Sequence, residues 1–492
     1  MATPPFVRRE AIRGRPTFWL AAFQGIKPRR LERSKSGGGA PSKLPPAANS
    51  RWRMRDRRRQ PEAVPMSNSS KRTLAIIANA PSPYRIAQHL RIADEMGEQV
   101  ELWSIFLNEH NWQPWSHALP EKIRPVVFGP GESVGRKKNL AAVWSDWRKA
   151  GRVIRWLKEH RVEAAVTTGC NSVGLMRIIA WCRRNGLPNY MFADSNVYGD
   201  RVTGWRRWVK RHYLSWVVRS LSGLMPCGEY GRRYFEAYGG AAKPSFFMPH
   251  EPDYRRIFET TDDDRDRAET KFQLQKGRRR FIYSGRLAAV KRVDTLIDAF
   301  AKIAGDRPDW DLLIVGGGPL EAELKSRVPA ALLNRFAWTG FIDDPYELAA
   351  LYTCGEVFIL PSSYEPWAVV VCEAAAAGLA IIASQVVGAA GELCRDGVNG
   401  RAFPPGSVDA LADALLEMSA DDDRLHEYRL ASLRVLDDWR RRGDPVQGVR
   451  LALADANLLP SPPPVQPHPA TPTSLDRPTR DESASVGGAL HR

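Results

Sequence analysis

The sequence lacks any apolar stretch that approaches the roughly 18 consecutive residues of a transmembrane helix, so we expect no membrane-spanning segment. Its six cysteines stand singly, without a C-x-x-C pair or a Cys/His cluster at metal-ligand spacing. This excludes the common structural zinc motifs, and we predict no metal site and reduced thiols in a cytoplasmic protein. The cysteines are Cys170, Cys182, Cys227, Cys354, Cys372 and Cys394.

A signal-peptide pattern is also missing, because the apolar run at 18–23 is short and no clear cleavage site follows it. Residues 1–70 are rich in proline, glycine and arginine, and we expect a disordered basic extension. An organelle transit peptide and a translation start at Met66 are two further hypotheses for this segment. Most of the net charge of +17 lies here, since residues 1–71 hold 17 Lys and Arg against 4 Asp and Glu. The charge therefore says little about the folded part.

Between these residues and the end of the chain, short apolar segments alternate with helical patterns, which predicts parallel sheets covered by helices on both faces. The alternation stops at a proline-containing, charged stretch near residue 260 and then starts again. Two such units in tandem place a ligand cleft between them, at the carboxyl ends of the strands. The predicted ranges are an N-terminal Rossmann-like domain at 71–248, a linker at 249–277, a C-terminal Rossmann-like domain at 278–430, a helical segment at 431–458 and a disordered Pro-rich tail at 459–492.

The first group of candidate site residues follows the strand expected at 281–284. Gly285 allows a tight turn, and Arg286 and Lys291 follow before the next helix begins. These groups suit the binding of a diphosphate. The forked guanidinium of Arg286, the mobile ammonium of Lys291 and the N-terminus of the next helix are all directed at the same space. A solvated loop with two surface cations is the alternative.

The second group follows the strand expected at 357–360. Glu365 lies where the loop enters a helix, and Glu373 lies inside that helix among alanines and valines. A carboxylate in such an apolar helix is costly without a partner, and sugar or ribose hydroxyls are suitable partners. A solvent-facing Glu373 is the alternative. Eight helical steps would separate the two carboxylates by roughly 12 Å, which is too far for a glycosidase pair.

From Gly285 to Phe403 the chain resembles the family-4, or group 1, glycosyltransferases of GT-B fold. The pieces that carry the resemblance keep the family's order and spacing, whereas the N-terminal half matches more loosely. They are Gly285-Arg286 with Lys291, 294–300, Leu313–Pro319, Thr339-Gly340-Phe341, Pro361-Ser362-Ser363 with Glu365 and Glu373, and Gly378, Gly388, Glu392 and 397–400.

The resemblance implies a retaining transfer from a UDP- or GDP-sugar, with no metal required. Arg286 and Lys291 would bind the donor diphosphate and stabilise the charge that develops on it. Glu365 would contact the donor sugar, and Glu373 the nucleotide ribose. The other donor-binding residues implied are Gly285, Gly317, Thr339, Gly340, Phe341, Trp367 and Ala368.

The acceptor is expected on the N-terminal domain. Arg85, after the strand at 74–78, is a candidate for an acceptor or donor phosphate, with a solvated helix-start arginine as the alternative. Many relatives have a histidine after a middle strand of this domain, but here Asp194 occupies that place. This difference leaves the catalytic contribution of the N-terminal domain open. Asp309-Trp310-Asp311 spells a metal-binding D-x-D pattern, which we interpret as a surface turn because it precedes a strand away from these loops.

The helix expected at 205–219 carries Trp205, Trp208 and Trp216 at helical spacing, with arginines beside them. A core face with a cationic rim is the favoured interpretation. A peripheral contact with an anionic membrane is the functional alternative, which would fit a lipid-linked acceptor.

We therefore expect a cytoplasmic glycosyltransferase of polysaccharide-biosynthesis type that acts on a glycan, a lipid-linked saccharide or a small acceptor. The competing hypothesis is a non-catalytic protein with a GT-B core that binds a nucleotide sugar or associates with nucleic acid. Its support is the arginine run at 51–59, while the intact set of candidate donor residues argues against it. An epimerase or a phosphorylase of similar architecture fits the loop motifs less well.

Overall fold

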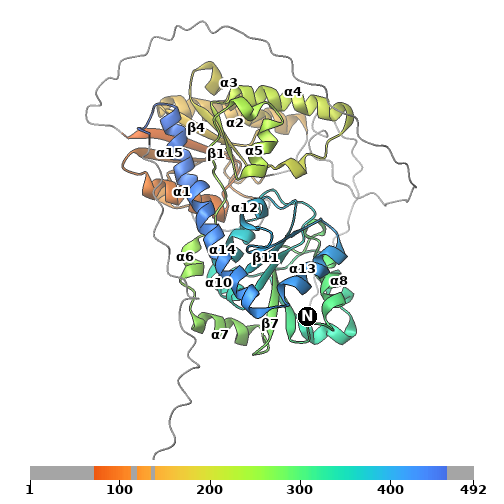
Figure 1. Cartoon of the computed structure of the whole chain (residues 1–492). Coiled ribbons are helices and arrows are strands. Elements are labelled where there is room, and N and C mark those ends of the chain that lie inside the picture. The colour runs from red at the N-terminus through yellow and green to blue at the C-terminus, as the bar shows by residue number, and fades with distance from the viewer. Residues whose placement is uncertain (1–70, 112–118, 135–138, 462–492) are drawn as a thin grey trace, which may run out of the picture. The chain divides into compact units, whose positions relative to one another are not determined.

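A computed structural model describes residues 71–111, 119–134 and 139–461 (Figure 1). The disorder expected at 1–70, and nearly all of that expected at 459–492, lies outside the described residues. In the described part, no helix combines the length and the apolar character needed to cross a lipid bilayer.

The N-terminal half is built on a six-stranded parallel sheet of order β3-β2-β1-β4-β5-β6. The strands are β1 (Arg72–Ala78), β2 (Val100–Phe106), β3 (Pro125–Val127), β4 (Ala164–Thr168), β5 (Asn189–Ala193) and β6 (Gly223–Pro226). The connecting helices are α1 (Pro83–Glu95), α2 (Leu140–Glu159), α3 (Val173–Arg184), α4 (Gly204–Ser220) and α5 (Glu229–Glu236).

Several of these helices begin at a polar side chain that accepts a hydrogen bond from a free backbone amide. Ser82 does so for α1, Asn139 for α2 and Ser172 for α3. These caps fix the ends of the helices that follow the strands. They therefore help to define the carboxyl edge of the sheet, where α1, α2 and α3 begin.

The second half repeats the plan with a six-stranded parallel sheet of order β12-β11-β10-β7-β8-β9. The strands are β7 (Arg279–Ser284), β8 (Trp310–Val315), β9 (Phe336–Gly340), β10 (Val357–Leu360), β11 (Ala380–Ser384) and β12 (Gly400–Phe403). The helices are α8 (Val293–Ile303), α9 (Glu321–Arg327), α10 (Pro345–Thr353), α11 (Val369–Ala376), α12 (Ala390–Leu393) and α13 (Val408–Met418). The two parallel sheets confirm the predicted fold class.

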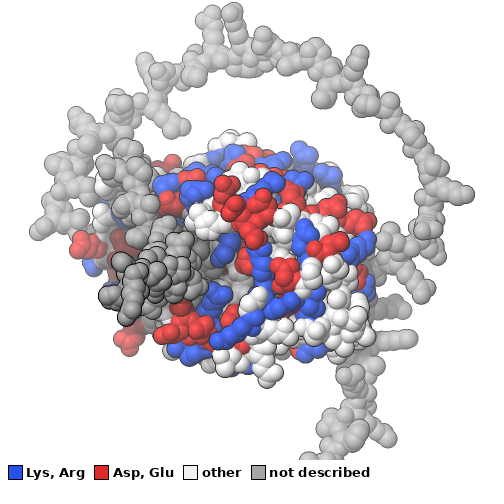
Figure 2. Space-filling model, turned by 60° about the horizontal axis from the view of Figure 1, so that its bottom comes forward, with Lys and Arg blue, Asp and Glu red and all other residues white. Residues whose placement is uncertain are grey.

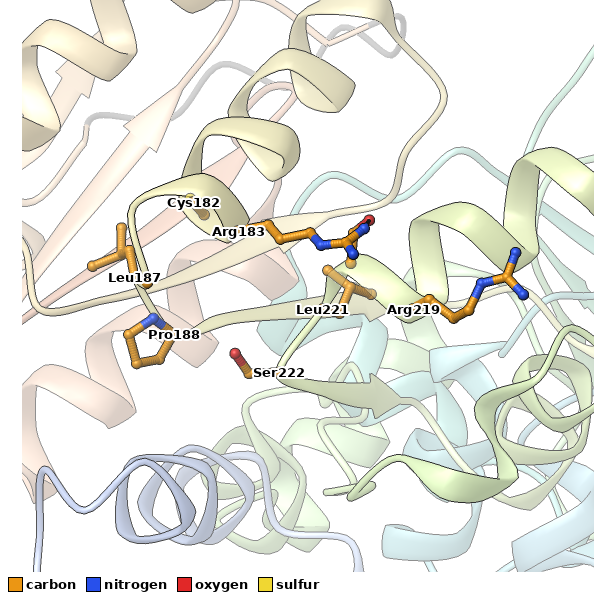
Figure 3. A pocket seen from close by; sticks show the side chains of 9 residues that line it. Cys182, Arg183, Leu187, Pro188, Arg219, Leu221 and Ser222 are labelled. Atoms are coloured by element: carbon orange, nitrogen blue, oxygen red, sulfur yellow. Dashed lines mark hydrogen bonds between the residues drawn. The ribbon is translucent and has the colours of Figure 1, made fainter.

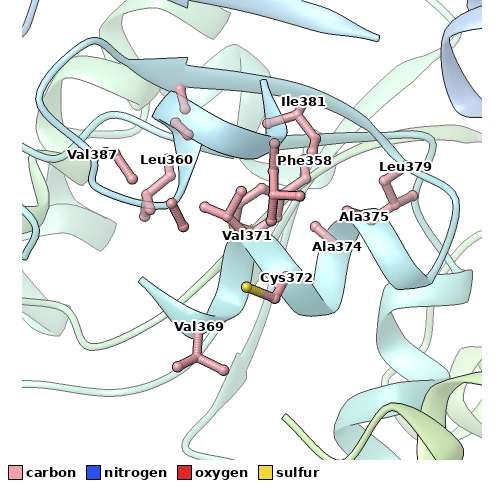
Figure 4. Close-up of a cluster of buried hydrophobic side chains, with 14 of the residues drawn as sticks. Phe358, Leu360, Val369, Val371, Cys372, Ala374, Ala375, Leu379, Ile381 and Val387 are labelled. Carbon is pink, nitrogen blue, oxygen red and sulfur yellow. The ribbon is translucent and has the colours of Figure 1, made fainter. Parts of the chain in front are cut away.

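The core of this half is built from apolar runs such as those of β10 and β11, in which nearly every residue is apolar and buried. Phe358, Leu360 and Ile381 lie beside Val371 and Cys372 of α11 (Figure 4). Each of these side chains is buried, and burying one such apolar side chain stabilises a fold by roughly 1.5–3 kcal/mol. Helix α11, which carries the candidate Glu373, is therefore held rigidly on β10 and β11.

The segment between the sheets contains α6 (Tyr254–Phe258) and α7 (Asp262–Lys271), and α14 (Asp422–Arg442) and α15 (Pro445–Asp455) follow the second sheet. Helix α15 returns to the N-terminal half and packs on α1 (Figure 1). The hydroxyl of Tyr190 donates to the carbonyl of Ala452, and Arg91 binds Glu251 and Asp444 at 2.5 and 2.7 Å. The last described helix thus packs on the N-terminal half, while the exact domain boundaries stay predictions.

The Asp309-Trp310-Asp311 segment is not the surface turn that we predicted. Trp310 and Asp311 belong to β8 and are buried. The Asp311 carboxylate pairs with Arg278 at 2.6 Å and with Arg335 at 2.9 Å. Charge neutralisation by two guanidinium groups explains how an aspartate is tolerated in a buried strand.

Candidate functional site

The loop after β7 and the loop after β8 pack backbone against backbone. The amide of Gly285 donates to the carbonyl of Val315, and the amide of Leu287 donates to the carbonyl of Gly317. A Cβ at Gly318 would lie 2.4 Å from the carbonyl oxygen of Leu287, so only glycine fits there. Gly285 has φ +151°, and Arg286, just after it, is exposed. The predicted donor residues Gly285, Arg286 and Gly317 therefore lie together.

Lys291 and Glu365 are brought together from loops 74 residues apart in the sequence. The Lys291 Nζ donates to Glu365 Oε2 at 2.5 Å, and the two side chains are only 17% and 16% exposed. Ser362 Oγ lies 3.4 Å from the same carboxylate oxygen. A largely buried ion pair at the carboxyl edge of the sheet combines a mobile cation with an acceptor for sugar hydroxyls.

The loop that carries Glu365 is strained and firmly held. Ala368 has φ +80°, a conformation that costs a non-glycine residue about 1–3 kcal/mol and that clusters at functional sites. The amide of Ala389 donates to the carbonyl of Trp367, and a Cβ at Gly388 would meet the carbonyl of Pro366 at 2.0 Å. This close packing fixes the backbone amides around residue 368 just before α11 begins.

Glu373 is buried in α11, so the solvent-facing alternative is wrong. Its Oε2 accepts a hydrogen bond from the hydroxyl of Tyr352 at 2.8 Å. Burial raises the pKa of Glu373 to about 7, while the Tyr352 hydrogen bond acts in the opposite direction. The carboxyl group is thus half protonated near neutral pH. Tyr352 is a site residue that we did not predict, because no local pattern marks it.

Thr339 and Gly340 end β9 next to the glycine loop, and Phe341 follows directly after the strand. The amide of Gly316 donates to the carbonyl of Gly340, and the Phe341 amide nitrogen lies 3.3 Å from the position of a Cβ on Gly317. Phe341 is 70% exposed. The predicted nucleotide-pocket residues therefore do form one contiguous edge with Gly317.

On the N-terminal half, Arg85 and Asp194 come together after β1 and β5. The Arg85 Nη1 donates to the carbonyl of Ala80 at 2.7 Å, so Arg85 is not a side chain in open water. Loss of hydration lowers the pKa of Arg85 and raises the pKa of Asp194, and the Arg85 charge opposes the rise at Asp194. The two groups therefore attract each other, although the loss of hydration disfavours the charged form of each.

Two histidines beside Arg85 were not predicted as part of this region. Burial and the nearby guanidinium lower the pKa of His89 and of His250 to about 3. His89 Nδ1 lies 2.8 Å from Ser104 Oγ. Both rings are therefore neutral at neutral pH and add no positive charge next to Arg85.

Asn196 links the two halves at the site. Its side-chain amide donates to the carbonyls of Glu365 at 2.8 Å and Pro366 at 3.2 Å. The Trp367 indole donates to the carbonyl of His250 at 2.8 Å. Its place two residues after Asp194 was the only sequence feature that could have marked Asn196 as a site residue. Its partners could not be predicted, because they lie about 170 residues away in the sequence.

A narrow crevice lies between these halves, and it has essentially no room for a water-sized sphere. Small-molecule sites typically have about 300–1,000 Å³, so a nucleotide-sized ligand requires the crevice to widen. The crevice is lined by Asp194, Cys227, Gly228, Tyr230, Gly231, Pro366, Trp367 and Gly388.

A second hollow, of about 240 Å³, lies at the opposite edge of the N-terminal sheet (Figure 3). Its lining includes Arg183 and Arg219, near the C-terminal ends of α3 and α4, and Arg183 donates to Ser220 Oγ at 3.1 Å. Cations at helix C-termini are stabilising on their own. None of the predicted site residues lines this hollow.

The loops after β7, β8, β9 and β10 lie in a part of the chain that is similar to known proteins. Residues 264–432 match the family model described as glycosyl transferases group 1. The alpha-D-kanosaminyltransferase of Streptomyces kanamyceticus is 30% identical over 248 residues, which are 48% of this chain and 60% of that protein. The 2-deoxystreptamine glucosyltransferase of the same organism is 30% identical over 232 residues, 46% of this chain and 57% of that protein. The matches thus span less than two thirds of these relatives.

Two solved structures share the fold over nearly four fifths of the chain. Anabaena HepE, solved in complex with UDP, has a TM-score of 0.61 at 16% identity and covers 79% of this chain and 100% of its own. Sucrose-phosphate synthase from Thermosynechococcus elongatus has a TM-score of 0.62 at 18% identity, covering 78% and 100%. The comparisons confirm the resemblance to group 1 and the GT-B fold, while the family-4 assignment stays a prediction.

Proposed function

Because residues 264–432 belong to the group 1 glycosyltransferases, we propose that this protein transfers a sugar from a nucleotide-sugar donor to an acceptor hydroxyl. The observation that carries the proposal is the buried pair of Lys291 and Glu365, held beside the glycine loops at the carboxyl edge of the second sheet. A uridine nucleotide is the first candidate donor, since HepE was solved with UDP, and a GDP-sugar is the second.

In the proposed reaction, the bond between the anomeric carbon and the diphosphate oxygen breaks and its electron pair leaves with the diphosphate. Arg286 and Lys291 balance the negative charge that grows on this leaving group. These cations supply the charge that a metal ion provides in other transferases, so the proposal includes no metal or other cofactor. Glu365 accepts hydrogen bonds from the donor sugar, and Glu373 from the ribose.

The acceptor oxygen then bonds to the anomeric carbon, and its proton passes to the departing diphosphate oxygen that carries the electron pair of the broken bond. Asp194, held near Arg85 on the N-terminal half, is the proposed acceptor-side group for this hydroxyl. Retention of configuration follows from the family resemblance. The acceptor is a glycan, a lipid-linked saccharide or a small molecule. With a lipid-linked acceptor, the protein would also contact the membrane surface through residues 205–219.

Saturation-transfer NMR with a panel of UDP- and GDP-sugars tests the proposal. We expect the wild-type protein to bind and slowly hydrolyse one donor, and Glu365→Ala to lose most of both, because the sugar loses its carboxylate partner. The matched control is Glu427→Ala, which removes an exposed glutamate from α14 and should change nothing. Binding of no nucleotide sugar by a folded sample would overturn the proposal and favour the nucleic-acid-associating alternative.

Donor affinity should also depend on pH through Glu373. The native pKa of about 7 lies above the usual carboxyl value, so the native protein holds an extra proton between about pH 4.5 and 7. The stability due to this group therefore falls as pH rises through that window. Ribose hydroxyls donate best to the ionised carboxylate, so donor affinity should rise about tenfold from pH 6 to 8. Isothermal titration calorimetry measures donor affinity at each pH. The same pH dependence in Glu373→Gln as in the wild type would contradict this assignment.

A further inference from the structure

The tryptophans of α4 are exposed, so the core face that we predicted for this helix is wrong. Trp205, Trp208 and Trp216 are 60%, 64% and 37% exposed. The side chains that pack α4 onto the sheet are instead Leu214, Val217 and Val218. An α-helix turns by about 100° per residue, which places the three tryptophans on the side opposite to these packed residues. The aromatic stripe therefore contributes little to the core.

Helix α2 exposes a second apolar group in its first half. Leu140, Trp144 and Trp147 follow each other at helical spacing and are 81%, 58% and 40% exposed. Helix α3 contacts both α2 and α4, so the three helices form one layer over the sheet (Figure 1). In both α2 and α4 the exposed group begins at the N-terminal turns.

These turns lie at a defined edge of the molecule. Helix α4 begins eleven residues after β5, and Asp194 is the first residue after that strand. Because all strands of the sheet are parallel, the N-terminal end of α4 lies at the same edge as Asp194 and Arg85. The exposed aromatic surface therefore adjoins the acceptor side of the proposed site.

The charge of this layer is strongly positive, and its two carboxylates, Asp146 and Glu159, both lie in α2. Helix α4 contains five Lys or Arg residues and no Asp or Glu, and α3 also contains no Asp or Glu. Arg206, Arg207 and Arg211 are exposed, and none of them forms an ion pair with a carboxylate in the described part of the chain. By contrast, positive and negative side chains are intermixed on the face of the molecule drawn in Figure 2.

We propose that the exposed faces of α2 and α4 dock onto an anionic phospholipid bilayer and present a lipid-anchored acceptor to the site. This inference rests on the proposed function and names its acceptor class. Indole rings prefer the headgroup level of a bilayer, and arginines beside them pair with lipid phosphates.

The same chemistry fits a nucleic acid less well. Single-stranded nucleic acids stack their bases on aromatic side chains that lie within a basic groove. Here the indoles project from helices, and Leu140, the most exposed of the group, offers apolar area but no ring for stacking. Apolar area beyond the aromatic rings suits the acyl region of a bilayer better than the stacked bases of a nucleic acid.

Vesicle flotation with the full chain tests the proposal. The vesicles are phosphatidylcholine alone or phosphatidylcholine mixed with phosphatidylglycerol. We expect the wild-type protein to float with the mixed vesicles. Trp205→Ala/Trp208→Ala and Arg206→Glu/Arg207→Glu/Arg211→Glu should each weaken binding about tenfold or more, because one cation near an anionic surface contributes about half a decade or more in affinity.

The matched control is Leu333→Ala/Tyr346→Ala, which removes exposed apolar side chains of 59% and 62% exposure from the C-terminal half. Every variant keeps residues 1–70, so their basic composition cannot explain a difference between variants. All variants should keep the wild-type melting temperature and donor binding. Those two readouts separate a failure of this inference from a failure of the proposed function.

Equal flotation of the wild type and both α4 variants would overturn the inference, as would no flotation of the wild type on mixed vesicles. Loss of polynucleotide binding in the variants with unchanged flotation would also overturn it and point to a nucleic acid instead. Loss of flotation with intact donor binding supports it.

Discussion

Lys291→Met is expected to lower kcat/KM for sugar transfer by about 10²–10³-fold, the usual cost of removing one preorganised group that stabilises developing charge. The Lys291 ammonium lies 2.5 Å from Glu365, on a side chain that is mostly buried, so its charge acts with little screening by water. In the proposed reaction it contacts the departing diphosphate. Steady-state kinetics on the donor identified by NMR measures the effect.

The loss should appear mainly in kcat, because the charge on the diphosphate grows only as the bond breaks. Lys302→Met is the matched control, since Lys302 lies on α8 of the same half and pairs with Asp409 on the surface. It should change kcat/KM by less than about twofold, as expected for an exposed ion pair. If the two lysine variants behave alike, Lys291 has no role in the chemistry.

Much of the fold follows from local patterns in the chain. The strand ranges predicted at 74–78 and 281–284 lie within β1 and β7, and the range predicted at 357–360 matches β10, because central parallel strands are continuous apolar runs. The short edge strands β3 and β12 were missed. β3 has three residues and begins with Pro125, and β12 begins with Gly400, so neither carries a strand pattern.

Burial was harder to predict than secondary structure. The periodic tryptophans of α4 indicate an apolar stripe, but periodicity does not show whether another element covers it. Asp311 was expected outside the sheet, because the pairing of a buried carboxylate with Arg278 and Arg335 depends on residues that only the fold brings near. Both errors concern partners that are distant in sequence.

In the candidate site, too, the local motifs were predicted, whereas contacts between residues distant in sequence were not. Its residues after β7 and β10 were predicted as two separate loops, each with its own local logic. Their meeting through Lys291 and Glu365, and the contacts of Tyr352 and Asn196, required the three-dimensional arrangement. Tyr352 follows the buried run Ala349, Ala350 and Leu351 of α10, where a tyrosine is ordinarily a core residue.

The largest stability effect is expected at Arg280 in β7, on the opposite edge of the sheet from the site. Its Nη1 donates to Glu269 of α7 at 2.8 Å and to the carbonyl of Cys354 at 3.3 Å, and the two charged side chains are 3% and 9% exposed. This buried pair fastens the segment between the sheets to the second sheet. Glu269→Gln should lower the free energy of unfolding by about 3–5 kcal/mol, because it leaves the Arg280 charge buried without its counter-ion.

Urea unfolding followed by tryptophan fluorescence measures this change. Removing both charges with Arg280→Met/Glu269→Leu should recover most of the loss, since an apolar pair of similar volume avoids the cost of burying two ions. Lys271→Met on the same helix is the control, because Lys271 is 61% exposed in its pair with Glu347 and should contribute less than about 1 kcal/mol. A double variant as unstable as Glu269→Gln alone would show that the hydrogen bonds from Arg280 to backbone carbonyls, rather than the ion pair, hold α7 in place.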